Sequence, residues 1–267
     1  MPDWNPDLYL EFERERTQPS IDLTMKIMLD QPRRIIDLGC GPGNSTKVLK
    51  ARWPQAEIAG LDSSKTMIAE ARAKDPAIEW ICADASSDLS RLGSFDLIFS
   101  NAALQWMPNH ERLLQNLFNM LNTGGVLAVQ VPATARMPVR IELGKLAGSD
   151  KWKGRFTGLN PGVSIHGPEF YYDIVCGLSA EVEVWETRYF HVMNTHAAIV
   201  QWYSSTGMRP YLDCLQEDGL RAEFQTDLEH ALKDVYPLQA DGKILFPFTR
   251  IFFTIKKRSA YTRESAS

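Results

Sequence analysis

The chain has 267 residues, of which 44% are hydrophobic and 23% charged, and its formal net charge is −4. Gly and Pro together make up about 12% of the chain, which is ordinary globular usage and excludes a low-complexity or collagen-like polypeptide. The length is typical of one large domain. Because no apolar run reaches the roughly 18 residues of a membrane helix and the first residues lack the apolar core of a signal peptide, we expect a cytoplasmic protein without membrane contact.

Charge and cysteine spacing narrow the expected partners. No block of five or six Lys and Arg residues provides the basic stripe that a nucleic-acid surface needs, so we expect no nucleic-acid partner. The four cysteines, Cys40, Cys82, Cys176 and Cys214, have no paired C-x-x-C spacing. The sequence therefore predicts neither a disulfide framework nor a metal site.

The first half of the chain alternates short apolar runs with helical spacing. We expect strands at 34–38, 57–62, 78–82, 95–99 and 126–131. Between them we expect helices at 45–53, from Ser63 or Ser64 to about residue 74, and at 110–121, where Gly124 and Gly125 predict a glycine C-cap. This alternation predicts a doubly wound α/β fold with a mostly parallel sheet covered on both faces.

After residue 131 this rhythm changes. We expect helices at 139–146 and about 168–176, a strand from 182 toward 191, helical structure over 195–236 and a last strand at 244–255, where Pro247 favours an edge or a bulge. The predicted organisation is a single domain with a core at 31–131. An N-terminal helical segment, 1–30, is expected to cover the site, with lid insertions at 133–167 and 195–236 and a flexible tail at 256–267.

A glycine-rich turn follows the first predicted strand directly, in the run Asp37-Leu38-Gly39-Cys40-Gly41-Pro42-Gly43. Such a G-x-G-x-G turn lets the backbone approach a ligand and directs helix N–H groups at it. Asn44 breaks the dinucleotide pattern G-x-G-x-x-G, which disfavours a nicotinamide dehydrogenase. The carboxylate of Asp37 needs a partner if it is buried. A ligand's ammonium group would supply one, and a simple capping role in the turn is the alternative.

Polar residues also end the next three predicted strands. Asp62 ends the second strand, where an acid commonly accepts from both ribose hydroxyls, and Asp84 ends the third, placed to meet an adenine amino group. Asn101 follows the fourth strand. Any one of them could cap a loop, but ligands bind at the carboxyl edge of such sheets. Together they predict a nucleoside site.

Residues 30–131 resemble the Rossmann-like S-adenosylmethionine-dependent methyltransferases, through the run from Asp37 to Gly43, Asp62, Ala83-Asp84, the segment 95–101 and Gly124-Gly125. The resemblance implies a seven-stranded sheet whose last strand is antiparallel, and S-adenosylmethionine as cofactor with S-adenosylhomocysteine as product. It also implies the cofactor-binding set: Asp37, Gly39, Cys40, Gly41 and Gly43 at the methionine part, Asp62 and Ser63 at the ribose, Asp84 and Ala85 at the adenine, and Asn101 beside them.

A narrower match involves the segments Ser100–Pro108 and Trp202–Leu212 and the N-terminal run Trp4-Asn5-Pro6-x-x-Tyr9. These segments are similar to family members that esterify a carboxylate of trans-aconitate or a related tricarboxylic acid. The segment 101–106 alone also resembles enzymes that methylate malonyl-carrier protein, which stays an alternative, as does a non-catalytic cofactor-binding protein. Amino-methylating relatives tend to carry Asn-Pro-Pro-aromatic where this chain has Ala102 and Ala103, which disfavours that class.

The chemistry of an acid substrate suggests which residues to look for. A carboxylate is ionised at neutral pH, so we expect a positioning mechanism without a catalytic base. Arginine suits carboxylate binding because its planar fork donates two hydrogen bonds. Arg209 is our first candidate, ahead of Arg136 and Arg140 and then of Arg14 and Arg16, although each could serve only in a surface ion pair. The other expected substrate contacts are Tyr9, Gln105, Trp106, His166, Trp202 and Tyr203, with Tyr171 and Tyr172 as possible hydrogen-bond donors.

Overall fold

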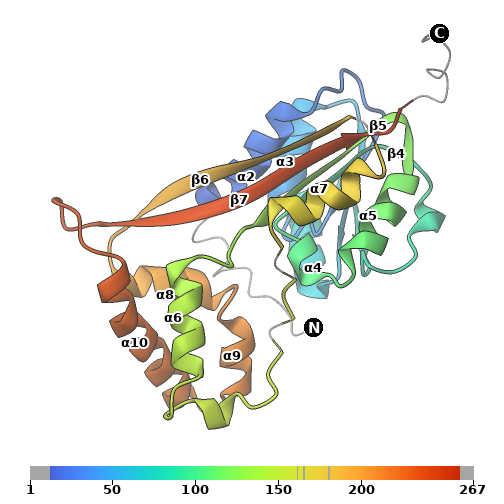
Figure 1. Ribbon diagram of the computed structural model, residues 1–267. Helices are drawn as coiled ribbons and strands as arrows, with labels where there is room; N and C mark the ends of the chain where they lie inside the picture. The colour runs from blue at the N-terminus through green and yellow to red at the C-terminus, as the bar shows by residue number, and fades with distance from the viewer. Residues whose placement is uncertain (1–12, 161, 165, 180, 259–267) are drawn as a thin grey trace. The chain divides into compact units, whose positions relative to one another are not determined.

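The computed structural model describes residues 13–160, 162–164, 166–179 and 181–258. It contains a seven-stranded sheet in the order β3-β2-β1-β4-β5-β7-β6. Strands β4, β5, β6 and β7 are labelled in Figure 1. The strands are β1 Arg34–Leu38, β2 Glu57–Asp62, β3 Glu79–Cys82, β4 Phe95–Asn101, β5 Leu121–Pro132, β6 Val182–Met193 and β7 Ile244–Lys256. Strands β1 to β5 pair in parallel, and β7 pairs antiparallel with β5. The predicted mostly parallel seven-stranded sheet is therefore confirmed.

The helices follow the expected alternation. They are α2 Glu13–Lys26, α3 Asn44–Arg52, α4 Lys65–Lys74, α5 His110–Asn119, α6 Pro138–Ala147, α7 Pro168–Cys176, α8 His196–Ser204, α9 Arg209–Cys214 and α10 Asp218–Val235, with short 3-10 turns at Ser90–Leu92, Leu104–Trp106 and Lys153–Arg155. Ser64, one of the two expected caps, begins α4, and its hydroxyl accepts from the backbone N–H of Met67 at 3.3 Å. Within residues 13–258, as far as they are described, no helix is long and apolar enough to cross a membrane.

The chain divides into two compact units. Unit 1 comprises residues 1–132, 166–187 and 250–267, and unit 2 comprises 133–165 and 188–249. Unit 1 contains β1 to β5, whereas unit 2 contains α6, α8, α9 and α10. In unit 2, Trp152 packs edge-on against Phe224 of α10 at 4.9 Å, and its indole donates to Asp227 at 2.8 Å. The ranges of unit 2 enclose most of the two segments that the sequence marks as insertions.

The expected glycine C-cap of α5 is wrong. The helix ends at Asn119, and Gly124 and Gly125 lie inside β5 instead. The register of β5 on β4 shifts between the Phe95–Leu121 and Leu97–Val126 pairs, and Gly124 adopts a φ of 80° in this irregularity. A side chain at Gly125 would come within 2.9 Å of the Asn122 carbonyl oxygen. Gly124 and Gly125 therefore form part of a β-bulge. Glycine is favoured in β-bulges as well as at helix ends.

Pro247 lies within β7, in the part of the strand that precedes its pairing with β5. That pairing runs from Arg250 to Lys256. A proline has no N–H to give to a neighbouring strand, so a position beyond the β5 ladder accommodates it. On the side of β7 that faces β5, Pro247 thus lies where no strand pairing with β5 is present, as the predicted edge-like environment requires.

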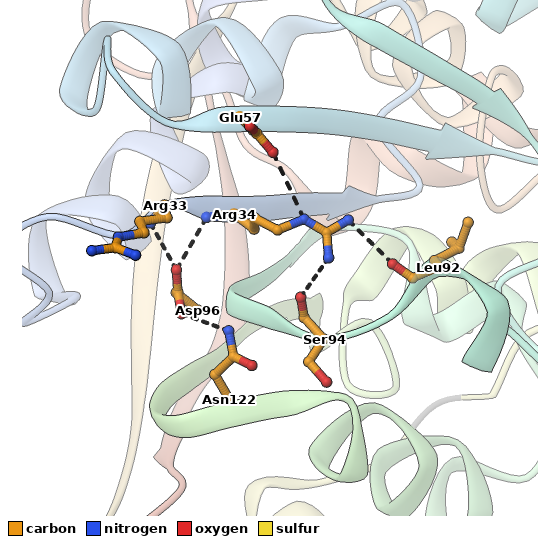
Figure 2. A network of polar contacts seen from close by, with 7 residues as sticks. All are labelled: Arg33, Arg34, Glu57, Leu92, Ser94, Asp96 and Asn122. Carbon is orange, nitrogen blue, oxygen red and sulfur yellow. Dashed lines mark hydrogen bonds and ion pairs between the residues drawn. The ribbon is translucent and has the colours of Figure 1, made fainter.

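A polar network ties the amino ends of β1, β4 and β5 together (Figure 2). One carboxylate oxygen of Asp96 accepts from the backbone N–H groups of Arg33 and Arg34, at 2.7 and 3.1 Å, and the other accepts from the Asn122 side chain at 2.7 Å. The guanidinium of Arg34 donates to the carbonyl oxygens of Ser94 and Leu92. Partial burial raises the pKa of Asp96, but these hydrogen bonds outweigh it and hold that pKa below its ordinary value.

Candidate functional site

The glycine turn after β1 brings the backbone unusually close to a neighbouring loop. Gly39, Gly41 and Gly43 adopt φ values of 70°, 54° and 91°, in the left-handed region that favours glycine. A side chain at Gly39 would also overlap the Cβ atom of Ala103, just after β4. The turn can therefore be built only with glycine at this position.

A pocket opens at the carboxyl ends of β1 to β4. Its lining is Gly39, Gly41, Leu61, Asp62, Ser63, Met67, Ala83, Asp84, Ala85, Asn101, Ala102, Ala103, Trp106 and Met107. The structure thus brings together most of the predicted cofactor-binding residues, with Trp106 from the predicted substrate set. Ala102, in this wall, has a φ of 55°. Such strain in a non-glycine residue is concentrated at functional sites.

The two acids in the pocket wall also organise their own loops. Asp62 accepts from the backbone N–H of Gly41 at 3.0 Å and from that of Ser64 at 2.8 Å. Asp84 accepts from the backbone N–H and the hydroxyl of Ser86, at 2.8 and 2.7 Å. Because a carboxylate has about four lone-pair positions, Asp84 retains acceptor capacity beyond these two hydrogen bonds. Loop capping and ligand binding are therefore compatible roles.

Asp37 lies behind the glycine turn and is completely buried. The hydroxyls of Ser45 and Thr46, at the start of α3, donate to its Oδ2 atom at 2.6 and 2.7 Å. Its Oδ1 atom has no hydrogen-bond partner in the described part of the chain. Burial raises the pKa of Asp37 to about 6, the two hydroxyls oppose this rise, and the nearby Asp62 adds to it. At neutral pH the site thus holds a buried carboxylate with an unfilled acceptor position.

At two of the predicted cofactor residues, Cys40 and Gly43, the Cα–Cβ direction leads toward the packed side of the turn, where Trp80 lies. Cys40 is buried in a cluster with Ile68, Ala71, Ile78 and Trp80, and burial raises the pKa of its thiol. A side chain at Gly43 would lie 2.8 Å from the indole of Trp80. Only the backbone of these residues is available to a ligand in the turn.

A buried histidine supports the pocket wall from behind. The Nε2 atom of His110 lies 2.8 Å from the Leu104 carbonyl oxygen and 3.1 Å from that of Met107, and the Tyr171 hydroxyl lies 3.1 Å from Nδ1. Since Nε2 faces only carbonyl oxygens, it carries the proton, and Nδ1 accepts from Tyr171. Burial lowers the pKa of His110, which keeps the ring neutral. The sequence marks His110 only as the start of a helix.

The other predicted substrate residues of unit 1 differ in their surroundings. His166 stacks on Phe170 at 3.7 Å and meets His110 edge-on at 5.2 Å. Gln105 is buried, and its amide donates to the Ala102 carbonyl oxygen at 2.6 Å. Tyr171 is buried and Tyr172 is half exposed. Arg16 of α2 is buried and Arg14 exposed, while Tyr9 lies outside the described residues.

The remaining candidates belong to unit 2. Tyr203 is buried, and the side chain of Arg140 lies near enough to its hydroxyl to affect the pKa of the phenol. Burial raises the pKa of Tyr203 to about 12, which keeps the phenol protonated as a donor. The Nε atom of Arg209 lies 3.8 Å from the Oδ2 atom of Asp213. Trp202 stacks on His191 at 4.8 Å inside this unit, and Arg136 is exposed.

Sequence reasoning missed two apolar pocket residues. Met67, a buried residue of α4, and Met107 both line the pocket, and the sequence analysis assigns neither of them to the site. Helical spacing predicts that Met67 faces inward but cannot distinguish a core from a pocket wall. The pocket therefore combines polar strand ends with a flexible apolar wall.

Comparisons with known proteins agree with this geometry. A family model described as a methyltransferase domain matches residues 35–125. The chain is 43% identical over 264 residues to trans-aconitate 2-methyltransferase of Methylobacterium radiotolerans, covering 97% of this chain and 100% of the relative. It is 41% identical over 257 residues to trans-aconitate 2-methyltransferase of Escherichia coli, covering 96% and 99%.

Solved structures share the fold at much lower identity. The YcgJ protein of Bacillus subtilis superposes with a TM-score of 0.60 at 17% identity, covering 91% of this chain and 100% of that one. Phosphoethanolamine N-methyltransferase 2 of Haemonchus contortus, in complex with S-adenosyl-L-methionine, has a TM-score of 0.53 at 15% identity, covering 90% and 53%. These two similarities concern the fold alone.

Proposed function

The chain belongs to the trans-aconitate 2-methyltransferase family of S-adenosylmethionine-dependent methyltransferases, and on this premise we propose that it esterifies a carboxylate of trans-aconitate. The observation that carries the proposal is the extent of the 43% identity. The alignment with this relative covers 97% of the chain, whereas the match to the general methyltransferase domain ends at residue 125. The relationship thus includes unit 2, where the predicted substrate arginines lie.

The pocket residues fit the cofactor. Gly39 and Gly41 provide a backbone cradle that a side chain at Gly39 would fill, and the carboxylates of Asp62 and Asp84 in the pocket wall suit ribose hydroxyls and an adenine amino group. The orphaned Oδ1 atom of Asp37 suits the ammonium of the methionine part, directly or through a water molecule. Met67 and Met107 supply an apolar wall.

S-adenosylmethionine supplies, when bound, a methyl group on a positively charged sulfur. The acceptor carboxylate is ionised at neutral pH, so no residue of the chain has to remove a proton from it. The chain's contribution is then to position the acid and to exclude water. Correct orientation of two reactants can contribute about 7–11 kcal/mol toward the barrier.

The acid needs cationic anchors because the chain as a whole carries a net charge of −4. Arg209 remains the first candidate. Arg140 gains support from its nearness to the buried Tyr203, because that phenol stays protonated and both groups could donate to one carboxylate. Trp202 is better explained as packing inside unit 2.

The direct test of the proposed function is the release of S-adenosylhomocysteine by the purified protein, with S-adenosylmethionine and a panel of di- and tricarboxylic acids. We expect turnover on trans-aconitate and a base-labile methyl ester as product. Binding of the cofactor without turnover on any free acid would contradict the proposal and favour a carrier-bound acid.

Replacement of Arg209 tests the anchoring role. We expect Arg209→Ala to raise the KM for trans-aconitate at least tenfold, consistent with the roughly 1.5–3 kcal/mol of a lost charged hydrogen bond, while the Kd for S-adenosylhomocysteine changes little. Arg155→Ala, at an exposed arginine in the same unit, is the matched control. Equal KM values for the two variants and the wild type would contradict the proposed role of Arg209 as an anchor for the acid.

A further inference from the structure

We propose that His110 and Tyr171, two buried residues outside the lining of the cofactor pocket, are positioning residues for one wall of that pocket. The wall segment is residues 102–109, and four of its members line the pocket: Ala102, Ala103, Trp106 and Met107. Through this wall the pair determines how tightly the pocket binds S-adenosylmethionine. The role rests on the proposed use of the pocket for the cofactor, and it is independent of which acid is methylated.

The wall segment is strained near both of its ends. In the part of the chain that the structure describes, Ala102 and Asn109 are the two non-glycine residues with a positive φ, at 55° and 51°. Asparagine tolerates this left-handed region, whereas alanine is disfavoured there relative to glycine. Such strain persists only where the surrounding structure holds the residue in place. The conformation of Ala102 therefore depends on contacts made by the rest of the wall.

The first part of the wall segment is held by the sheet and by the glycine turn. The backbone N–H of Ala102 donates to the carbonyl oxygen of Gln130 in β5 at 3.0 Å. The methyl group of Ala103 occupies the space that a side chain at Gly39 would need. These contacts fix where the segment leaves β4, but they do not reach the part that carries Trp106 and Met107.

That second part is held by His110. Its Nε2 atom lies 2.8 Å from the carbonyl oxygen of Leu104 and 3.1 Å from that of Met107. Leu104 begins the 3-10 turn Leu104–Trp106, and Met107 directly follows it. A single imidazole N–H thus connects both ends of the turn to α5. All of these residues belong to unit 1.

Tyr171 of α7 fixes the imidazole in turn. Its hydroxyl donates to the Nδ1 atom of His110 at 3.1 Å, which keeps the proton on Nε2, where the two carbonyl oxygens need it. The ring of Tyr171 is fully buried and stacks on Phe253 of β7 at 5.1 Å. His166 meets His110 edge-on at 5.2 Å. A continuous series of contacts therefore links β7, through α7 and α5, to the pocket wall.

This arrangement acts on the position of the wall. Without the His110 hydrogen bonds, the strain at Ala102 favours a relaxed wall over the one seen in the structure. The apparent affinity for the cofactor then falls in proportion to the fraction of molecules whose wall is in place. A histidine that only stabilised the fold would leave that affinity unchanged. The two roles are therefore separated by measuring binding and stability together.

The first test compares three variants of α5 by calorimetry with S-adenosylhomocysteine and by thermal unfolding. His110→Phe keeps a buried ring but removes the N–H, and we expect its Kd to rise about tenfold. His110→Gln places an amide N–H near the position of Nε2 and should restore most of the affinity. Leu117→Ala, at a buried residue of the same helix outside the pocket, is the control. It should lower the Tm and leave the Kd unchanged.

The second test asks whether the strain at Ala102 is involved. Glycine removes the cost of the positive φ, so a wall with Ala102→Gly needs His110 less. We expect His110→Phe to raise the Kd about tenfold in the wild-type background and only about twofold in the Ala102→Gly background. A defect unrelated to the wall would give the same factor in both backgrounds.

The third test concerns the tyrosine hydroxyl. We expect Tyr171→Phe to raise the Kd about threefold in the wild type and to have no further effect in the His110→Phe variant, because the hydroxyl acts through His110. Tyr236→Phe is the matched control. It removes a buried hydroxyl in unit 2 that accepts from the Val139 N–H at 3.1 Å, and it should leave the Kd unchanged.

A folded His110→Phe variant with the wild-type Kd would overturn the proposal. So would a loss of affinity of equal size in the two Ala102 backgrounds. If His110→Phe does not fold, Tyr171→Phe decides, and a Kd equal to that of Tyr236→Phe would overturn the positioning role. None of these measurements contains an acid substrate, so their outcome is distinct from that of the turnover assay with trans-aconitate.

Discussion

The two edges of the sheet in unit 1 handle polar side chains in opposite ways. At the amino ends of β1, β4 and β5, Asp96 uses both carboxylate oxygens, and its partners lie within 3.1 Å. At the carboxyl ends, polar atoms of Asp37, Asn44, Asn101 and Gln130 are buried and have no hydrogen-bond partner among the described residues. Asp96 at the first edge has partners on both oxygens, whereas the second edge has buried polar atoms, one of which, Oδ1 of Asp37, our proposal assigns to a ligand.

This difference separates two kinds of polar residue that look alike in the sequence. Asp96 and Asp37 are both acids in a short apolar strand. The hydrogen bonds of Asp96 lower its pKa, while burial raises that of Asp37. The two carboxylates thus differ in their partners: both oxygens of Asp96 accept hydrogen bonds, whereas Oδ1 of Asp37, which we propose faces a ligand's cation, has none among the described residues. Substitutions at the two edges should accordingly have separable effects on stability and on binding.

The largest effect is expected from the glycine turn. Gly39→Ala combines a left-handed φ of 70° with an overlap on Ala103, so the loop must move, and we expect the Kd for S-adenosylhomocysteine to rise at least a hundredfold. Gly124→Ala, at a φ of 80° in the amino-end bulge, meets no atom within 4 Å. It should cost only about 1–2 kcal/mol of stability and leave the Kd unchanged. Calorimetry gives the Kd of each variant and thermal unfolding gives its stability. Equal Kd values for Gly39→Ala and Gly124→Ala would contradict the expected difference between the two edges.

At the amino edge the expected loss is in stability alone. In Asp96→Asn the amide oxygen can still accept from the backbone N–H groups, but the new NH2 group then meets the NH2 of Asn122, so the Asn122 amide must turn over and the hydrogen bonds to a charged acceptor are lost. We expect a loss of about 2 kcal/mol, or a Tm lower by about 4–8 °C, with an unchanged Kd for S-adenosylhomocysteine. Asp150→Asn, at an almost fully exposed acid, is the control and should shift stability by less than about 1 kcal/mol. Weakened ligand binding in Asp96→Asn would show that the two edges are coupled.

The smallest of the three effects concerns the titration of Asp37. Folding raises its pKa from about 3.9 to about 6, so the folded protein holds this proton more tightly than the unfolded chain. Its contribution to the stability of the ligand-free protein therefore declines as the pH rises from about 4 to about 6, and is level above. A cationic ligand group prefers the ionised form, so the affinity for S-adenosylhomocysteine should rise across the same pH range.

Asp37→Asn removes this titration. We expect it to flatten both pH profiles and to weaken S-adenosylhomocysteine about tenfold at pH 7.5, as for a lost charged hydrogen bond. The Tm at that pH should not fall, because the amide oxygen can still accept from Ser45 and Thr46. A pH dependence of binding that survives in Asp37→Asn would assign it to another group.

Local chemistry in the sequence was sufficient for the sheet core and for most of the pocket. The alternation of apolar runs with helical spacing predicted β1 to β5 and the helices between them. Asp62 and Asn101 are the last residues of β2 and β4, Asp84 follows the end of β3 by two residues, and all three line the pocket. This succeeds because strand ends in a parallel sheet meet at one edge, so residues far apart in the chain become neighbours by topology. The glycines of β5 failed because a bulge and a helix end favour the same residue type.

Tertiary structure alone decided how each polar group is used. The sequence by itself predicted the family through the resemblance of its motifs. It predicted the doubly wound sheet through periodicity, and through spacing along the chain it predicted that Asp62 and Asp84 lie at one edge of that sheet. It could not distinguish the saturated Asp96 from the unsaturated Asp37, or reveal the contact between Gln130 and Arg250, which are 120 residues apart. Burial and hydrogen-bond satisfaction depend on what packs around a side chain, and those neighbours are fixed only when the strands pair.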